Sequence, residues 1–157
     1  MLASVAIALS ACASPPVFKD SPASTVTPAE MAVEPERYHG ADVVWGGKIL
    51  GVRNLADTTE VEIVAYPLDG SQRPDQTAPT EGRFVIALPG FLEPLDFPAG
   101  RFVTLRGHIA GSRTAIVDEH ELAMPLVADA SVHLWPVNFP YEESRVHFSF
   151  GVGVGIH

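Results

Sequence analysis

The chain contains a single cysteine, Cys12, among its 157 residues. This scarcity excludes an internal disulfide and any cysteine-rich metal site. Basic side chains are also few: 10 lysines and arginines against 19 acidic residues give a formal net charge of −9, which argues against nucleic-acid partners. No apolar run reaches the roughly 18–20 residues that a transmembrane helix requires. A single small acidic domain is therefore the expected organisation.

Turn-forming residues, in contrast, are abundant. The 14 prolines and 13 glycines favour turns and short strands over long helices. Apolar and polar residues alternate between positions 59 and 66, so that Val61, Ile63 and Ala65 would lie on one face of a strand and Glu60 and Glu62 on the other. Comparable patterns predict main strands over residues 42–53, 59–66, 83–88, 101–110 and 114–127, and shorter ones at 132–135 and 145–150.

These strands predict an all-β fold, a small antiparallel barrel of OB-like type over residues 38–136. Gly46-Gly47 interrupts the first strand and indicates a bend or a close backbone approach. Gly111-Ser112 is typical of a tight hairpin turn. Residues 89–100 form a proline-rich connection where such barrels often carry a helix. An outer-membrane β-barrel is the alternative, but prolines interrupt the chain too often for its longer strands.

The amino terminus has the pattern of a lipoprotein signal. Residues 1–11 are uncharged and largely apolar, and they lead into Leu9-Ser10-Ala11-Cys12, a lipobox. The sequence predicts cleavage between Ala11 and Cys12 and a lipid thioether on the Cys12 thiol, the most nucleophilic group there. Two or more acyl chains would give a stable anchor. Because no lysine or arginine precedes Cys12, we expect that the start of the signal peptide is truncated.

Residues 12–37 are expected to form a flexible lipidated tether rich in alanine, serine, proline and threonine. Within it, Thr27-Pro28-Ala29-Glu30 predicts the start of a short helix, with Thr27 as N-cap and Glu30 completing a capping box. Residues 137–157 are expected to form a C-terminal extension. Its strictly alternating stretch at 148–156 predicts a terminal strand, either frayed or able to pair with a sheet edge.

Candidate chemistry is sparse. Asp118 and His120 would share one face of a strand, and His108 could join them across a hairpin, so these three side chains are the candidates for a metal or reactive site. No metal motif and no nucleophile motif accompanies them, however. The sequence therefore predicts no catalytic residue, no metal and no cofactor.

Trp45 and Trp135 are the candidate binding residues, each next to glycine or proline. Packing in the core or at a barrel end is the interpretation we favour for both. The alternative is an exposed aromatic platform for a peptide or a glycan.

Several short motifs appear in one order along the chain. They are Val44-Trp45-Gly46-Gly47, Tyr66-Pro67-Leu68, Arg73-Pro74, Gly82-Arg83-Phe84, Gly90-Phe91-Leu92-Glu93-Pro94, Gly100-Arg101, Val103-Thr104, Gly107 and His133-Leu134-Trp135-Pro136. With the lipobox, this ordered set resembles the Slp family of outer-membrane lipoproteins of Gram-negative bacteria, described as starvation-inducible. Glu93 stands where the family tends to have aspartate, and His120, Leu122 and Met124 stand where it tends to have aromatics.

The resemblance implies a lipid-anchored envelope protein with a small β domain and implies no reaction. We expect acylated Cys12 to hold the protein in the periplasmic leaflet of the outer membrane, and Ala13 after the cysteine is compatible with that membrane. The expected role is structural or interactive, with an envelope protein as partner and a link to stress or stationary phase implied by the resemblance alone. The alternative is a periplasmic module that binds a small ligand, a peptide or a glycan.

Overall fold

The structure, a computed structural model, describes residues 14–139. Its elements are α1 (Pro28–Val33), the 3-10 helix η1 (Pro35–Tyr38), β1 (Asp42–Asn54), β2 (Thr58–Tyr66), β3 (Arg83–Pro89), β4 (Phe102–Val117) and β5 (His120–Leu134). The predicted cleavage site at Ala11 and Cys12 and the predicted terminal strand lie outside the described residues. Between residues 14 and 139, no helix is long and apolar enough to cross a membrane.

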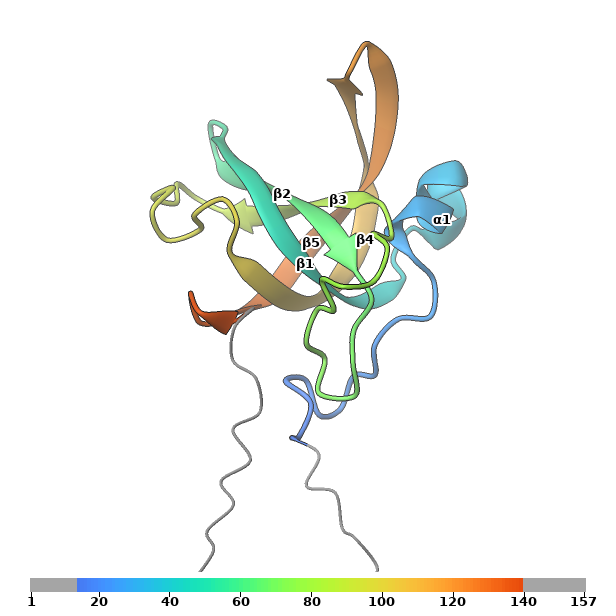
Figure 1. Cartoon of the computed structure of the whole chain (residues 1–157). Coiled ribbons are helices and arrows are strands. Elements are labelled where there is room, and N and C mark those ends of the chain that lie inside the picture. The colour runs from blue at the N-terminus through green and yellow to red at the C-terminus, as the bar shows by residue number, and fades with distance from the viewer. Residues whose placement is uncertain (1–13, 140–157) are drawn as a thin grey trace, which may run out of the picture.

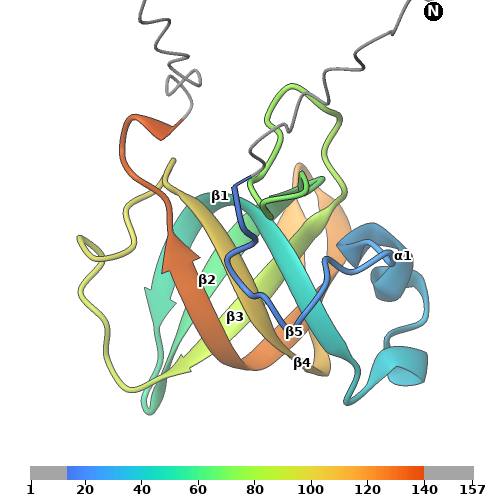
Figure 2. The same cartoon turned by 90° about the horizontal axis from the view of Figure 1, so that it is seen from below.

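The five strands close into a barrel in the order β1-β2-β3-β5-β4 (Figures 1 and 2). β1 pairs antiparallel with both β2 and β4, and the barrel closes through a parallel pairing of β3 with β5 at Val85–Leu126 and Ile86–Val127. This strand order is that of an OB-fold, a five-stranded Greek-key barrel. The predicted all-β barrel is therefore confirmed, and residues 90–101 between β3 and β4 carry no helix, as expected.

The hairpin between β4 and β5 differs from the prediction. We expected the turn at Gly111-Ser112, but β4 continues to Val117 and the chain turns at Asp118 and Glu119, both with positive φ angles. Gly111, at φ 145°, instead belongs to a β-bulge where the β4–β5 register shifts. A bulge and a turn both favour glycine, so the residue alone did not distinguish them. The extended hairpin projects from the barrel as an arm, residues 111–124 (Figure 1).

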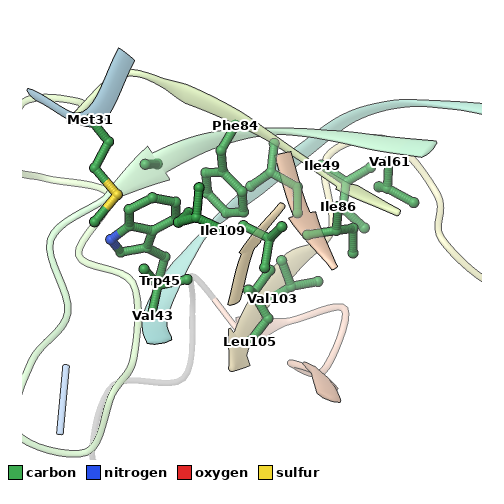
Figure 3. Packing of buried hydrophobic residues seen from close by; sticks show 13 residues of the cluster. Met31, Val43, Trp45, Ile49, Val61, Phe84, Ile86, Val103, Leu105 and Ile109 are labelled. Atoms are coloured by element: carbon green, nitrogen blue, oxygen red, sulfur yellow. The ribbon is translucent and has the colours of Figure 1, made fainter. Parts of the chain in front are cut away.

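Inward side chains of all five strands and α1 fill the barrel (Figure 3). The ring centroids of Trp45 and Phe84 lie 5.2 Å apart within this core. The alternation expected at residues 59–66 is confirmed on β2, where Val61, Ile63 and Ala65 are all buried. The buried cluster consists of Met31, Val43, Trp45, Ile49, Val61, Ile63, Ala65, Phe84, Ile86, Val103, Leu105, Ile109 and Val127.

The glycine pair in β1 allows a close approach between backbones. A Cβ atom on Gly47 would lie 2.0 Å from the carbonyl oxygen of Val64 on β2, and one on Gly46 would lie 2.6 Å from the Leu68 side chain. Distances under 3 Å require the backbone or its neighbours to move. The glycines thus let β1 lie against β2 and β4 at the point where it pairs with both strands.

Much of the expected tether is folded onto the barrel. Ser24 exchanges hydrogen bonds with Val44 at the start of β1: its N–H donates to the Val44 carbonyl (3.1 Å), and its hydroxyl accepts from the Val44 N–H (2.9 Å). Met31 of α1 is only 4% exposed within the core. The capping box of Thr27 and Glu30 is confirmed. Residues before position 38 thus already pack on the barrel, as far back as Phe18, whose N–H donates to Gln72 Oε1.

We expect Gly47→Ala to destabilise the fold by about 3 kcal/mol or more, because its methyl group would overlap the Val64 carbonyl and force backbone shifts. Chemical unfolding followed by circular dichroism measures the difference. Gly51→Ala is the matched control on the same strand, since nothing lies within 4 Å of its Cβ position. Equal stabilities of the two variants would contradict this account of β1.

Candidate functional site

The three candidate ligands His108, Asp118 and His120 do not form a site. His108 lies opposite Ala128 in the barrel, with its Nε2 3.6 Å from Asp129 Oδ2. Asp118 and His120 lie at the tip of the arm, nine or more residues further along the hairpin, which is roughly 30 Å. Residues 14–139 contain no group of three or more metal-ligating side chains. The hairpin prediction failed here because the turn lies later than expected.

Trp45 is a core residue and offers no binding platform. Its side chain is 3% exposed, and its indole N–H donates to the Val26 carbonyl at 2.9 Å. The alternative interpretation of Trp45 as part of an exposed surface is therefore corrected in favour of packing. Its one polar atom fixes the segment before α1, a contact that a buried tryptophan normally requires.

Trp135 lies half-buried in a cluster at one barrel end. Its ring centroid is 5.0 Å from that of Phe139, and the Arg73 guanidinium lies 5.5 Å and 4.8 Å from the two ring centroids. The Trp135 indole N–H donates to the Thr104 hydroxyl at 2.9 Å. Packing and a cation–π contact account for this cluster. Arg73 and Phe139 were missed as its members because both lie in irregular segments after strands, whose paths no local sequence pattern predicts.

An open groove of about 810 Å³ lies between residues 20–26 and residues of β1 and β4. Its lining is mixed: Asp42 and Asp129 are acidic, Arg106 is basic, and His108 and the apolar Met31 also line it. Neither tryptophan lines it. A second cavity beside Trp45 is about 160 Å³, below the roughly 300 Å³ of a typical ligand pocket. The groove has the size of a ligand site, but its mixed lining selects no ligand class.

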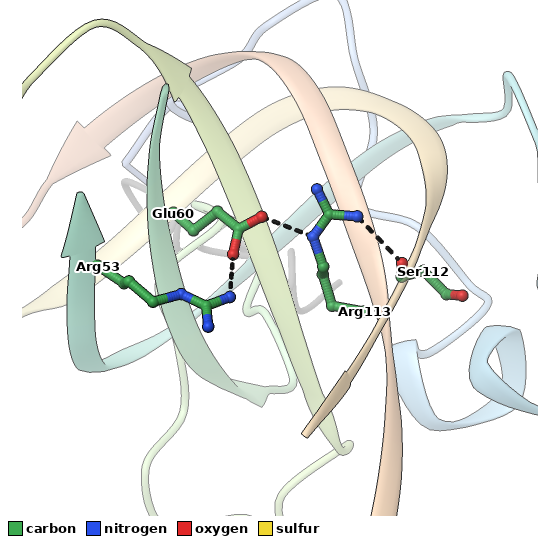
Figure 4. A network of polar contacts seen from close by, with 4 residues as sticks. All are labelled: Arg53, Glu60, Ser112 and Arg113. Carbon is green, nitrogen blue, oxygen red and sulfur yellow. Dashed lines mark hydrogen bonds and ion pairs between the residues drawn. The ribbon is translucent and has the colours of Figure 1, made fainter. Parts of the chain in front are cut away.

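A buried carboxylate connects the arm to the barrel (Figure 4). Glu60 on β2 is 4% exposed and accepts hydrogen bonds from Arg53 Nη2 on β1 and Arg113 Nε on the arm, both at 2.6 Å. Burial raises the pKa of Glu60, but the hydrogen bonds and charges of the two arginines outweigh it and lower that pKa overall. The contact is structural: it orients the arm against β1 and β2.

Two acidic residues, Glu30 of α1 and Glu81 of the β2–β3 connection, lie near each other. Burial, and to a smaller extent the charge of Glu30, raises the pKa of Glu81. The Glu81 carbonyl accepts from the Ala29 N–H at 3.0 Å, so the residue joins α1 to the barrel through its backbone. No cation pairs with its carboxylate in the ion pairs of residues 14–139.

Comparison with known proteins identifies relatives over almost the whole chain. The model of the outer membrane lipoprotein Slp family matches residues 9–152. The outer membrane protein Slp of Escherichia coli is 31% identical over 156 residues, which cover 98% of this chain and 82% of that protein. The uncharacterized lipoprotein YeaY of the same organism is 35% identical over 109 residues, which cover 68% of this chain and 56% of YeaY. An uncharacterized Haemophilus influenzae protein is 25% identical over 85% of this chain and 74% of its own length.

We expect Glu60→Gln to lower stability at neutral pH by about 2 kcal/mol, because the amide keeps the shape but loses two charge-assisted hydrogen bonds. Because folding lowers the pKa of Glu60, its carboxylate stabilises the folded protein fully above the pKa that Glu60 has in the unfolded chain. This stabilisation is lost as the pH falls through the pKa that Glu60 has in the folded protein. The variant should therefore show a shallower loss of stability in acid. Urea unfolding between pH 3 and pH 7 measures both effects.

Glu34→Gln is the control, since Glu34 pairs with Arg37 on the surface and such pairs contribute little. If Glu60→Gln had the same stability and the same acid dependence as Glu34→Gln, the contacts of Glu60 with Arg53 and Arg113 would contribute nothing to stability.

We expect Glu81→Gln to stabilise the protein near neutral pH. Because folding raises the pKa of Glu81, its contribution to the stability of the folded protein is complete below the pKa that Glu81 has in the unfolded chain. That contribution is lost as the pH rises through the pKa that Glu81 has in the folded protein. Glutamine removes this loss, so the advantage of the variant should appear as pH rises above the acid range. Thermal unfolding from pH 4 to pH 7 tests it, with the exposed Glu36→Gln as control. An advantage independent of pH would contradict this cause.

Proposed function

Because the chain belongs to the outer membrane lipoprotein Slp family, we propose that acylated Cys12 anchors it in the periplasmic leaflet of the outer membrane, where it serves a non-enzymatic interaction role. The observation that carries the proposal is the lipobox Leu9-Ser10-Ala11-Cys12, which contains the only cysteine of the sequence. Two or more acyl chains on that residue would hold the protein stably on the bilayer. We extend the role to stress or stationary-phase physiology on the basis of the resemblance.

The packing of the N-terminal segment supports a short connection to the membrane. Phe18 is already bound to Gln72 through its backbone, and only five residues separate it from Cys12. A fully extended chain would span about 20 Å between Cys12 and Phe18. A lipid anchor at Cys12 would therefore keep the adjacent end of the barrel close to the bilayer.

An interaction role fits the side chains better than catalysis. The three residues that could have formed a reactive site lie apart along the β4–β5 hairpin, and the buried polar groups Glu60 and Thr104 are engaged in structural hydrogen bonds. The barrel instead presents the arm and the connection between β3 and β4 as projecting segments (Figure 1). Projecting loops on a rigid scaffold are common sites of recognition.

We expect Cys12→Ser, expressed from the gene's own locus, to move the protein from the outer-membrane fraction to the soluble fraction, because the oxygen of serine does not take the lipid thioether. Fractionation after a high-salt wash and mass spectrometry of the intact protein measure location and acylation. Ser10→Ala is the matched control, since it keeps a small residue in the lipobox. A membrane-bound Cys12→Ser protein, or a wild-type protein that retains residues 1–11 with Cys12 unmodified, would overturn the anchor.

A further inference from the structure

Two neighbouring loops expose apolar side chains. Leu55 in the β1–β2 turn is 43% exposed, and Phe91 and Leu95 in the β3–β4 connection are 67% and 87% exposed. The loops are joined directly, because the Gly90 N–H donates to the Asp57 carbonyl at 2.9 Å. We call Leu55, Phe91 and Leu95 the distal patch. An aromatic and two leucines exposed on adjoining loops are typical of an interaction site.

The loop that carries the patch is held by buried polar groups. Thr59 is fully buried, and its hydroxyl donates to the Gly90 carbonyl at 2.8 Å and accepts from the Leu92 N–H at 3.1 Å. The Asn54 side chain also bonds both backbone groups of Leu92, at 3.1 and 3.3 Å. Phe91 lies between the two tethered residues, so its exposure is imposed by the loop conformation. A preorganised loop loses less conformational entropy when a partner binds.

The surroundings of the distal patch are acidic. Asp57, Glu93 and Asp96 are exposed on the same two loops. Residues 54–60 and 84–100 contain no lysine, arginine or histidine. The adjoining cation Arg53 is exposed but is paired with the buried Glu60 carboxylate, so the loops themselves keep a negative charge. This charge distribution selects a partner whose contact surface combines apolar and basic side chains, and it opposes both an anionic lipid surface and a second copy of the same acidic patch.

The patch also lies away from the start of the described chain. Figure 1 places the β1–β2 turn at the upper end of the barrel, whereas the dark-blue start of the chain lies at the lower end, and the view from below separates them as well (Figure 2). The two cavities described above are lined by other residues. The β3–β4 connection lies at the side of the barrel, so neither loop of the patch lies at the end where the described chain begins (Figure 1).

We propose that the distal patch is a docking surface for a basic, apolar segment of a partner protein. Phe91 and Leu95 supply the apolar contact, and Glu93, Asp96 and Asp57 pair with the basic side chains around it. The inference deepens the proposed interaction role. It needs no lipid, so the test uses the full chain carrying Cys12→Ser in solution.

The probe is an 18-residue helical peptide of leucine and lysine with one apolar face, compared with the same peptide carrying glutamate in place of lysine. Amide NMR shifts locate binding, and fluorescence anisotropy measures affinity. We expect shifts at residues 54–57 and 90–98 with the lysine peptide. Phe91→Ser with Leu95→Ser should weaken binding about tenfold or more. Glu93→Gln with Asp96→Asn should weaken it and reduce its dependence on salt.

Ile116→Ser is the matched control, because Ile116 is equally exposed, at 78%, but lies on the arm. Equal weakening by this control, equal binding of the glutamate peptide, or shifts located elsewhere would overturn the proposal. So would phosphatidylglycerol vesicles that shift the same amides, or self-association of the protein that Phe91→Ser abolishes. Circular dichroism verifies that each variant is folded. If the peptide does not bind, the proposal that Cys12 is acylated still stands. If Cys12 proves to be unacylated, the peptide-binding result still stands.

Discussion

The barrel depends on the close approach of β1 to β2 at Gly47. β1 pairs with two strands at once, and at this point the Val64 carbonyl occupies the space where any other residue would carry its Cβ. The neighbouring Gly46 likewise leaves room for Leu68 of the β2–β3 connection. Without this approach β1 could not remain paired with both β2 and β4, and the barrel would open between β1 and β2.

The start of β1 also determines how the N-terminal segment is held. Gly46 is the first residue of β1 that pairs with β2, so the backbone N–H and carbonyl of Val44 have no partner on β2. Ser24 fills this position by bonding to Val44, and the Trp45 indole bonds to Val26. Trp45 therefore serves two structural purposes, because its ring packs on Phe84 and its N–H fixes the approach to α1. A lipid on Cys12 would thus act on the barrel through a segment that is part of its packing.

The sequence predicted those features that depend on local patterns. Alternation at 59–66, the glycine pair and the capping box at Thr27 each have a short-range cause, and the structure confirms them. Gly111 misled the hairpin prediction because glycine suits both a bulge and a turn. The packing of residues 18–26 was missed because it depends on backbone groups of β1 left unpaired far along the chain. The prediction that His108 and His120 lie together failed because the position of the β4–β5 turn decides their separation, and the sequence did not fix that position.

Two adjacent residues of β2 organise the projecting segments at the other end. Successive side chains of a strand point to opposite faces, so Thr59 lies inside the barrel end while Glu60 lies outside. Thr59 holds the β3–β4 connection, and Glu60 holds the arm through Arg113. Both contacts bury a polar group, which is unfavourable unless its hydrogen bonds are made in full. Neither contact involves residues 14–38, so the arm and the Phe91 loop are each held by hydrogen bonds made within the strands and loops of the barrel. These two contacts would therefore remain in place wherever the proposed anchor at Cys12 held the N-terminal segment.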